Sequence, residues 1–248
     1  MLLYVLAVLT PLGQRLDAST LGSFPALRDE PWMRIYGARN ALMLGLVVLA
    51  ALAAVGALLA RRFLAVAAAA ICLGGTGVLA ALFDIAVPRP DFGAFAYAHN
   101  TYPSGHVAVC AAGVIAIAWL NPRWAPRPVV AVLAGVVWIE AAMSLLSFAH
   151  RGSDVLGGIL LAGAVAFAVQ AAVGVVVSPA RRLRAWTAVG SAVCLTGAVC
   201  VLIAMADVPR APDVAGGGML LACAGVLVVL VARQGAVASV EVGSESRR

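Results

Sequence analysis

Long apolar runs decide what this chain can fold into. A helix needs roughly 20 residues to cross the hydrocarbon core of a bilayer. Runs of about that length lie near residues 40–60, 63–83, 105–120, 129–149, 154–178, 185–206 and 215–232. Of all residues 63% are hydrophobic and only 11% are charged, far from the composition of a soluble domain. We therefore expect an all-α fold, a polytopic helix bundle in a membrane.

Residues 1–12 form a further apolar segment that is short for a span on its own. We expect it to be an eighth helix, extended by Gly13 and Gln14. A start codon assigned too late and a signal sequence are the alternatives. The signal sequence is disfavoured because the basic first region is missing and no small-residue cleavage site follows clearly. The polar residues from Gln234 onwards predict a disordered tail.

The arginines give the orientation, because the chain contains no lysine. Clusters such as Arg61 with Arg62, and Arg181 with Arg182, fall on alternate turns and so share one side of the membrane. The loops on the opposite side contain most of the acidic residues. The positive-inside rule makes the arginine-rich side cytoplasmic. We expect an integral, multi-pass protein of the cell membrane, with the segment YPSGH at Tyr102–His106 facing outwards.

Net charge and cysteines suggest no further function. The charge of +6 comes from arginines at helix ends, without the stripe that nucleic-acid binding requires. The five cysteines lie in apolar runs without zinc-type spacing, so we expect small buried side chains. We expect no metal, no cofactor and no nucleic-acid partner. The sequence does not give the oligomeric state.

Two segments on the predicted outer face carry polar chemistry. Arg89 stands between two prolines, which restrict the backbone that presents its guanidinium to an anion. Ser104 and Gly105 precede a helix whose first N–H groups are unpaired, and glycine lets an anion approach them closely. His106 enters that helix in its first turn. These residues predict a phosphate cradle with a titratable group beside it.

His150 and Asp154 lie four residues apart in a third segment. They would share a face if a helix contained both. A tight turn at Gly152, leading into a helix capped by Ser153 or Asp154, is equally compatible with the sequence. In either geometry the carboxylate can hold one imidazole nitrogen protonated and leave the other free to attack.

Together these motifs resemble those of the type 2 phosphatidic acid phosphatase superfamily, the lipid phosphate phosphatases. The motifs are Arg89-Pro90, then Pro103 to His106, then His150 and Asp154 followed by VLGG. The resemblance covers about residues 1–178 and implies a six-helix core over that range. The remainder would be a two-helix appendage at 179–233 and the tail at 234–248.

The resemblance implies roles for these residues. His150 would attack phosphorus and become a phosphohistidine, Asp154 would orient it, and His106 would protonate the leaving oxygen. Arg89, Ser104 and Gly105 would bind the phosphate, and no metal would be needed. The substrate would be a membrane lipid phosphate or diphosphate, with a prenyl or a glycerolipid tail.

Two cations that the superfamily pattern includes are missing. Its lysine position is Leu82 here, and its second arginine position is Ser144. We expect Arg151, next to the nucleophile, to compensate, and then Arg39 or Arg34 near the outer end of the 40–60 span. Two alternatives are a phosphotransferase that uses the same site and an inactive lipid-binding relative. A third is a transporter, and the evidence for it is Glu140, an acid predicted near the middle of the membrane.

Overall fold

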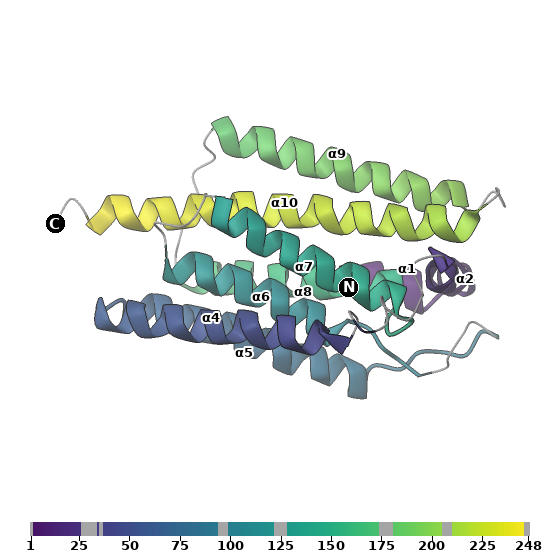
Figure 1. Ribbon diagram of the computed structural model, residues 1–248, viewed down its shortest axis with the longest axis horizontal. Helices are drawn as coiled ribbons and strands as arrows, with labels where there is room; N and C mark the ends of the chain where they lie inside the picture. The colour runs from purple at the N-terminus through teal and green to yellow at the C-terminus, as the bar shows by residue number, and fades with distance from the viewer. Residues whose placement is uncertain are drawn as a thin grey trace.

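The computed structural model describes residues 2–25, 34, 37–93, 99–121, 128–173, 181–204 and 210–245. Over these residues the chain is helical and contains no strand. The elements are α1 (Leu2–Val8), α2 (Pro11–Ser19), η1 (Thr20–Gly22), α4 (Arg39–Leu59), α5 (Phe63–Ala86), α6 (Gly105–Leu120), α7 (Pro128–Leu146), α8 (Gly152–Ala172), α9 (Arg181–Ala204) and α10 (Ala211–Glu245). The predicted all-α membrane bundle is confirmed (Figure 1).

Six helices in the described part of the chain are long and apolar enough to cross a membrane. They correspond to the predicted runs, and they are α4, α5, α7, α8, residues 185–204 of α9 and residues 211–233 of α10. The seventh predicted run is α6, which has only 16 residues. Two predicted ends lie outside the described residues: residue 178, which also ends the predicted six-helix core, and residue 206.

The single eighth helix expected at residues 1–12, extended by Gly13 and Gln14, is wrong, because two short helices lie there. Helix α1 has seven residues, and Thr10 then begins a new helix, α2, with Pro11 in its first turn. The Thr10 hydroxyl accepts a hydrogen bond from the Gly13 N–H, which is a side-chain N-cap. Two short helices cannot span a bilayer. They lie at one end of the bundle instead (Figure 1).

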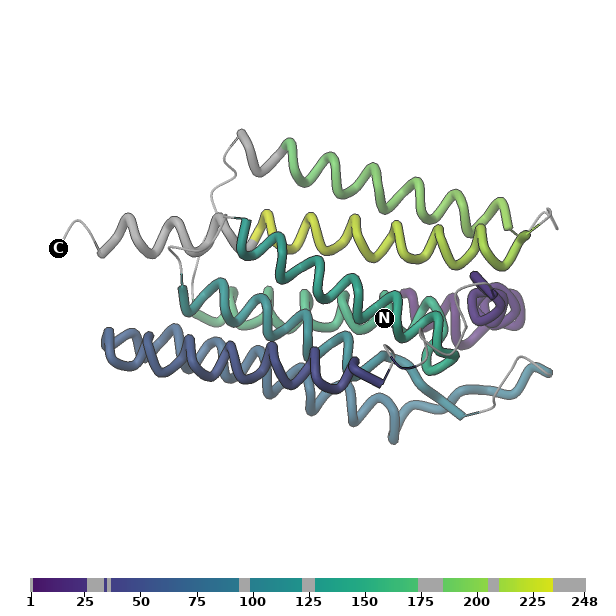
Figure 2. Tube along the Cα trace, viewed as in Figure 1, coloured from purple at the N-terminus to yellow at the C-terminus, as the bar shows by residue number. Residues whose placement is uncertain are grey.

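Helix α6 is the centre of the bundle. Nearly all of its residues from Val107 to Leu120 are buried, and its neighbours are α4, α5, α7 and α8. Apolar side chains of α10 join the same core cluster, among them Cys223, Leu227 and Leu230. Helix α10 is thus packed into the core, whereas α9 packs mainly along α10, as the Cα trace in Figure 2 shows. Helix α10 also extends to Glu245, past Gln234, where composition predicts disorder.

Small residues permit the closest helix contacts. A methyl carbon added at Gly197 of α9 would lie 2.4 Å from the Gly218 carbonyl oxygen of α10. One added at Gly163 of α8 would lie 2.8 Å from the Leu230 side chain. Both distances are shorter than real carbon contacts. The crossing at Gly197 requires glycine because the atom it meets is backbone, whereas the Leu230 side chain could rotate away from a larger residue at position 163.

Candidate active site

The predicted site residues meet at one end of the bundle. Helix α4 begins there with Arg39, α5 ends just before Arg89, α6 begins with Gly105 and His106, and α8 begins after His150. This is the right-hand end in Figure 1, where α1 and α2 also lie. Segments that are far apart in the sequence thus place their polar residues together.

The second motif forms the start of α6. Ser104 is the N-cap residue, but its hydroxyl makes no capping hydrogen bond. The Ser104 side chain is fully buried, and its Oγ has no hydrogen-bond partner among the described residues. A methyl carbon added at Gly105 would meet no atom within 4 Å, so there is open space beside the first turn. The first turn of α6 therefore has a buried hydroxyl donor without an acceptor and an uncrowded glycine beside it.

The third motif is a turn followed by a helix, so His150 and Asp154 do not lie on one helix face. Helix α8 begins at Gly152, and Asp154 accepts a hydrogen bond of 3.0 Å from the backbone N–H of the N-cap residue Arg151. The distance from His150 Nδ1 to Asp154 Oδ2 is 3.8 Å. This is an ion-pair distance but too long for a hydrogen bond. The imidazole is 14% exposed and the carboxylate is fully buried.

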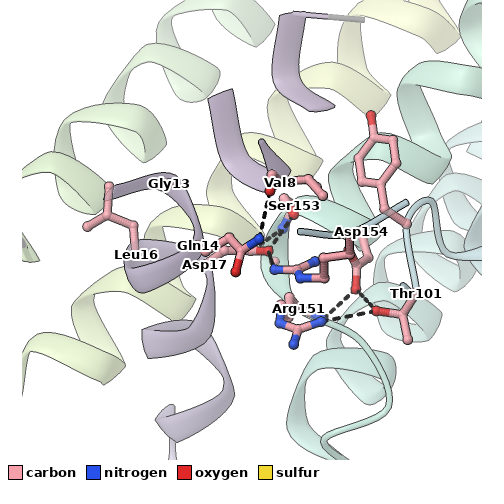
Figure 3. A network of polar contacts seen from close by, with 12 residues as sticks. Val8, Gly13, Gln14, Leu16, Asp17, Thr101, Arg151, Ser153 and Asp154 are labelled. Atoms are coloured by element: carbon pink, nitrogen blue, oxygen red, sulfur yellow. Dashed lines mark hydrogen bonds and ion pairs between the residues drawn. The ribbon is translucent and has the colours of Figure 1, made fainter. Parts of the chain in front are cut away.

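Asp154 also binds the loop that precedes α6. Thr101 Oγ1 donates a hydrogen bond to Asp154 Oδ2 and accepts one of 3.4 Å from Arg151 Nη1 (Figure 3). Arg151 is fully buried and is the largest side chain that is so. Its guanidinium, predicted as a phosphate ligand, thus lies inside the protein beside the Thr101–Asp154 pair.

Two glycines bring the second and third motifs together. A methyl carbon added at Gly158 would lie 2.7 Å from the Ser104 carbonyl oxygen, and one at Gly157 would lie 2.4 Å from the Tyr102 ring. The Ser104 N–H also donates a hydrogen bond of 2.8 Å to the Asp154 carbonyl oxygen. The GG pair after the third motif therefore sets the separation of the cradle and the histidine.

His106 is held by α4. Its Nε2 donates a hydrogen bond of 2.8 Å to Asn40 Oδ1. Arg39 and His150 are both near enough to influence the His106 charge. His106 therefore has both His150 and Arg39 as charged or titratable neighbours at this end of the bundle. Sequence reasoning missed Asn40, although its position beside Arg39 at a helix start was a usable signal.

Arg89 has a partner that the sequence did not suggest. Its Nη2 lies 3.4 Å from Asp17 Oδ2, and both side chains are 2% exposed. Neither neighbouring acid takes this place, because Asp84 and Asp91 are exposed and Asp91 instead accepts a hydrogen bond from the Gly93 N–H. The second nitrogen, Arg89 Nη1, is buried without a hydrogen-bond partner among the described residues.

Helices α1 and α2 hold the backbone on both sides of Arg89. The Tyr4 hydroxyl donates a hydrogen bond of 2.6 Å to the Pro88 carbonyl oxygen. Gln14 Nε2 donates one of 2.7 Å to the Pro90 carbonyl oxygen. The segment that was predicted to be an eighth helix thus anchors the first motif. The sequence feature that could have indicated this role is the polar pair Gln14 and Asp17, three residues apart after an apolar run.

The two positions without the expected cations differ in their surroundings. Leu82 is 51% exposed and points out of the bundle. Ser144 is fully buried beside His150, since its carbonyl oxygen accepts a hydrogen bond of 3.1 Å from the His150 N–H. Its hydroxyl lies 3.5 Å from Glu140 Oε1, so Glu140 is buried one turn below the site.

Burial changes the acidity of two groups at this end of the bundle. Desolvation and the neighbouring Asp154 charge raise the pKa of Asp17 to about 6, although hydrogen bonds from Ser153 and the Arg89 charge act in the opposite direction. Desolvation also raises the pKa of Tyr102 to about 12. Asp17 therefore titrates near neutral pH.

The described residues contain no group of three or more histidine, cysteine or acidic side chains that could hold a metal ion. Comparison of the chain with family models, with curated proteins and with solved structures found no match of any of the three kinds.

Proposed function

We propose that this protein is an integral membrane phosphatase that hydrolyses a lipid phosphate or diphosphate through a phosphohistidine intermediate. One observation carries the proposal. Buried polar atoms are normally hydrogen-bonded. Yet four predicted site residues each have a buried atom without such a partner among the described residues: Arg89 Nη1, Ser104 Oγ, His150 Nδ1 and Asp154 Oδ1. Two of these groups, the Arg89 guanidinium and the Ser104 hydroxyl, are donors, and a phosphate would supply the acceptors that they lack.

The reaction has two balanced steps. His150 Nε2 attacks phosphorus, the bond from phosphorus to the lipid oxygen breaks, and His106 gives its proton to that oxygen. His106, now neutral, accepts a proton from water, and the resulting hydroxide attacks the phosphohistidine and releases phosphate. Asp154 stabilises the His150 imidazolium, which requires the 3.8 Å separation to shorten when substrate binds.

The location of the site suits a lipid substrate. It lies where α4, α5 and α6 have an end, and the exposed surfaces of α4 and α5 are apolar. A phosphorylated headgroup would enter the cradle while the tail stays between lipid chains. We infer from the arginine distribution that this end faces the extracytoplasmic side. A prenyl phosphate or diphosphate, phosphatidic acid and phosphatidylglycerol phosphate all fit this description.

Arg39 and Arg151 are the proposed substitutes for the missing cations. Phosphoryl transfer depends strongly on charge stabilisation, and loss of a catalytic arginine can cost about 10³- to 10⁵-fold in rate. Arg39 lies near His106, and Arg151 follows His150 directly. A lysine at position 82 would project from an exposed face of α5, so Arg39 and Arg151 are better placed to supply the positive charge.

A second candidate is an inactive lipid-binding relative, and one observation favours it. Arg89 is already paired with Asp17, so a phosphate must share this guanidinium. A phosphotransferase would use the same residues with another acceptor in place of water.

Phosphate release by the purified protein in liposomes tests the proposal. The substrates are phosphatidic acid, prenyl phosphate, prenyl diphosphate and phosphatidylglycerol phosphate. We expect release from at least one of them, abolished by His150→Ala and unchanged by His99→Ala, since His99 is an exposed histidine outside the motifs. Equal release from wild type and His150→Ala would contradict the mechanism. No release by folded wild-type protein would favour the transferase or the inactive relative.

A further inference from the structure

Asp17 is a buried acid that none of the three motifs contains. It lies on α2 with a relative exposure of 3%. Burying a carboxylate is costly unless it is paired and hydrogen-bonded. The contacts of the Asp17 carboxylate therefore indicate which groups its charge stabilises.

The Asp17 carboxylate connects two of the motifs. Oδ1 accepts a hydrogen bond of 2.8 Å from the Ser153 N–H, and Oδ2 accepts one of 2.7 Å from the Ser153 hydroxyl. Oδ2 also lies 3.4 Å from Arg89 Nη2. Figure 3 shows Asp17 reaching from α2 to Ser153 at the start of α8. One side chain thus ties the first-motif arginine to the helix that follows the nucleophile.

The contact with Arg89 leaves half of the guanidinium available. Asp17 contacts Nη2, whereas Nη1 is buried and has no hydrogen-bond partner among the described residues. An arginine side chain has considerable rotamer freedom, and a fixed guanidinium loses less entropy when it binds an anion. A carboxylate on one nitrogen can therefore aim the other.

The backbone near Arg89 does not depend on Asp17. Tyr4 and Gln14 hold the carbonyl groups of Pro88 and Pro90. The Thr20 hydroxyl accepts a hydrogen bond of 2.9 Å from the Gly152 N–H, so α8 has a second anchor on the N-terminal segment. Removing the Asp17 charge should consequently loosen the guanidinium and not the loop.

We infer that Asp17 is a positioning residue of the phosphate site: it fixes the Arg89 guanidinium against the start of α8, with Nη1 left for the substrate phosphate. The inference rests on the proposed function. Asp17 does not touch the reacting atoms and acts through Arg89.

Binding of inorganic phosphate by the full-length protein in detergent, measured by calorimetry, tests the inference. Asp17→Asn keeps the shape of the side chain and an oxygen for the Ser153 N–H but removes the charge. We expect the Kd for phosphate, and the KM for the lipid substrate, to rise about tenfold with little change in kcat. The matched control is Asp91→Asn, which removes an exposed charge two residues from Arg89 and should leave both values unchanged.

A double-mutant cycle separates positioning from a merely structural role. If Asp17 acts through Arg89, then Asp17→Asn should weaken phosphate binding no further in an Arg89→Ala background. Equal losses in both backgrounds would mean that Asp17 only stabilises the helix start. Tighter binding by Asp17→Asn would mean that the carboxylate competes with phosphate. Either result would overturn the inference.

Failure of the inference differs from failure of the proposed function. A wild type that binds and hydrolyses phosphate esters, with Asp17→Asn behaving like Asp91→Asn, would refute only the role of Asp17. A folded wild type that neither binds inorganic phosphate nor hydrolyses any substrate would refute both.

Discussion

Gly158 sets the distance between Ser104 of the proposed phosphate cradle and the helix that follows His150, the proposed nucleophile, so Gly158→Ala should damage catalysis more than stability. The added methyl carbon would lie 2.7 Å from the Ser104 carbonyl oxygen and 3.1 Å from the Ala108 nitrogen. Both are backbone atoms, so neither can rotate away. Because ordinary contact begins near 3.4 Å, the start of α6 must move by about 0.7 Å away from α8.

A displacement of that size affects the site directly. The Ser104 N–H donates to the Asp154 carbonyl oxygen at 2.8 Å, and lengthening along this bond would bring it to the limit of a hydrogen bond. A misplacement near 1 Å can cost about 100-fold in rate, whereas overpacking typically costs about 1–3 kcal/mol in stability. We therefore expect kcat/KM to fall by about 100-fold, with a modest decrease in thermal midpoint.

Phosphate release from liposomes gives kcat/KM, and a thermal melt in detergent gives the stability. The matched control is Gly75→Ala in α5, whose methyl carbon would lie at an ordinary 3.8 Å from the Val165 side chain of α8. It should keep its activity. Activity of Gly158→Ala equal to that of Gly75→Ala, in protein of normal stability, would refute the spacing argument.

Two further predictions concern groups outside the motifs. Asn40→Ala removes the acceptor of the His106 Nε2 hydrogen bond, so kcat should fall about tenfold. KM and the thermal midpoint, measured by the same phosphate-release assay and thermal melt, should change little. An unchanged kcat would show that Asn40 does not orient His106. Burial raises the pKa of Asp17 to about 6, above the ordinary value of 3.8 for an aspartate. Between these values the folded protein binds more protons than the unfolded chain, so the stability that protonated Asp17 contributes is lost as pH rises through about 6. On acidification from about pH 7 to about pH 5, thermal melts should show wild type gaining about 1 kcal/mol relative to Asp17→Asn. A constant difference would mean that Arg89, Asp154 and Tyr102, the charged and titratable neighbours, leave Asp17 with an ordinary pKa.

The sequence predicted the membrane bundle well, because each long apolar run corresponds to one helix. It also placed His106, His150 and Arg39 on one face, since the arginine pattern orients the loops. It could not predict the partner of Arg89. Asp17 lies 72 residues away, and no local pattern connects the two.

The N-terminal segment also shows that local sequence does not predict long-range contacts. Residues 1–12 are apolar, and composition alone predicted one helix there. Thr10 and Pro11 stop the first helix and start another. The polar side chains of α2 then find partners in segments distant in sequence, which only the folded chain brings near.

Trapping the covalent intermediate tests the central claim most directly. A lipid substrate carrying labelled phosphate is mixed with the protein, the reaction is quenched in alkali, and labelled peptides are identified by mass spectrometry. The account predicts a phosphorylated histidine at His150 that is absent from His150→Ala and present in His99→Ala. Phosphate release without label at His150, or label that persists in His150→Ala, would contradict it.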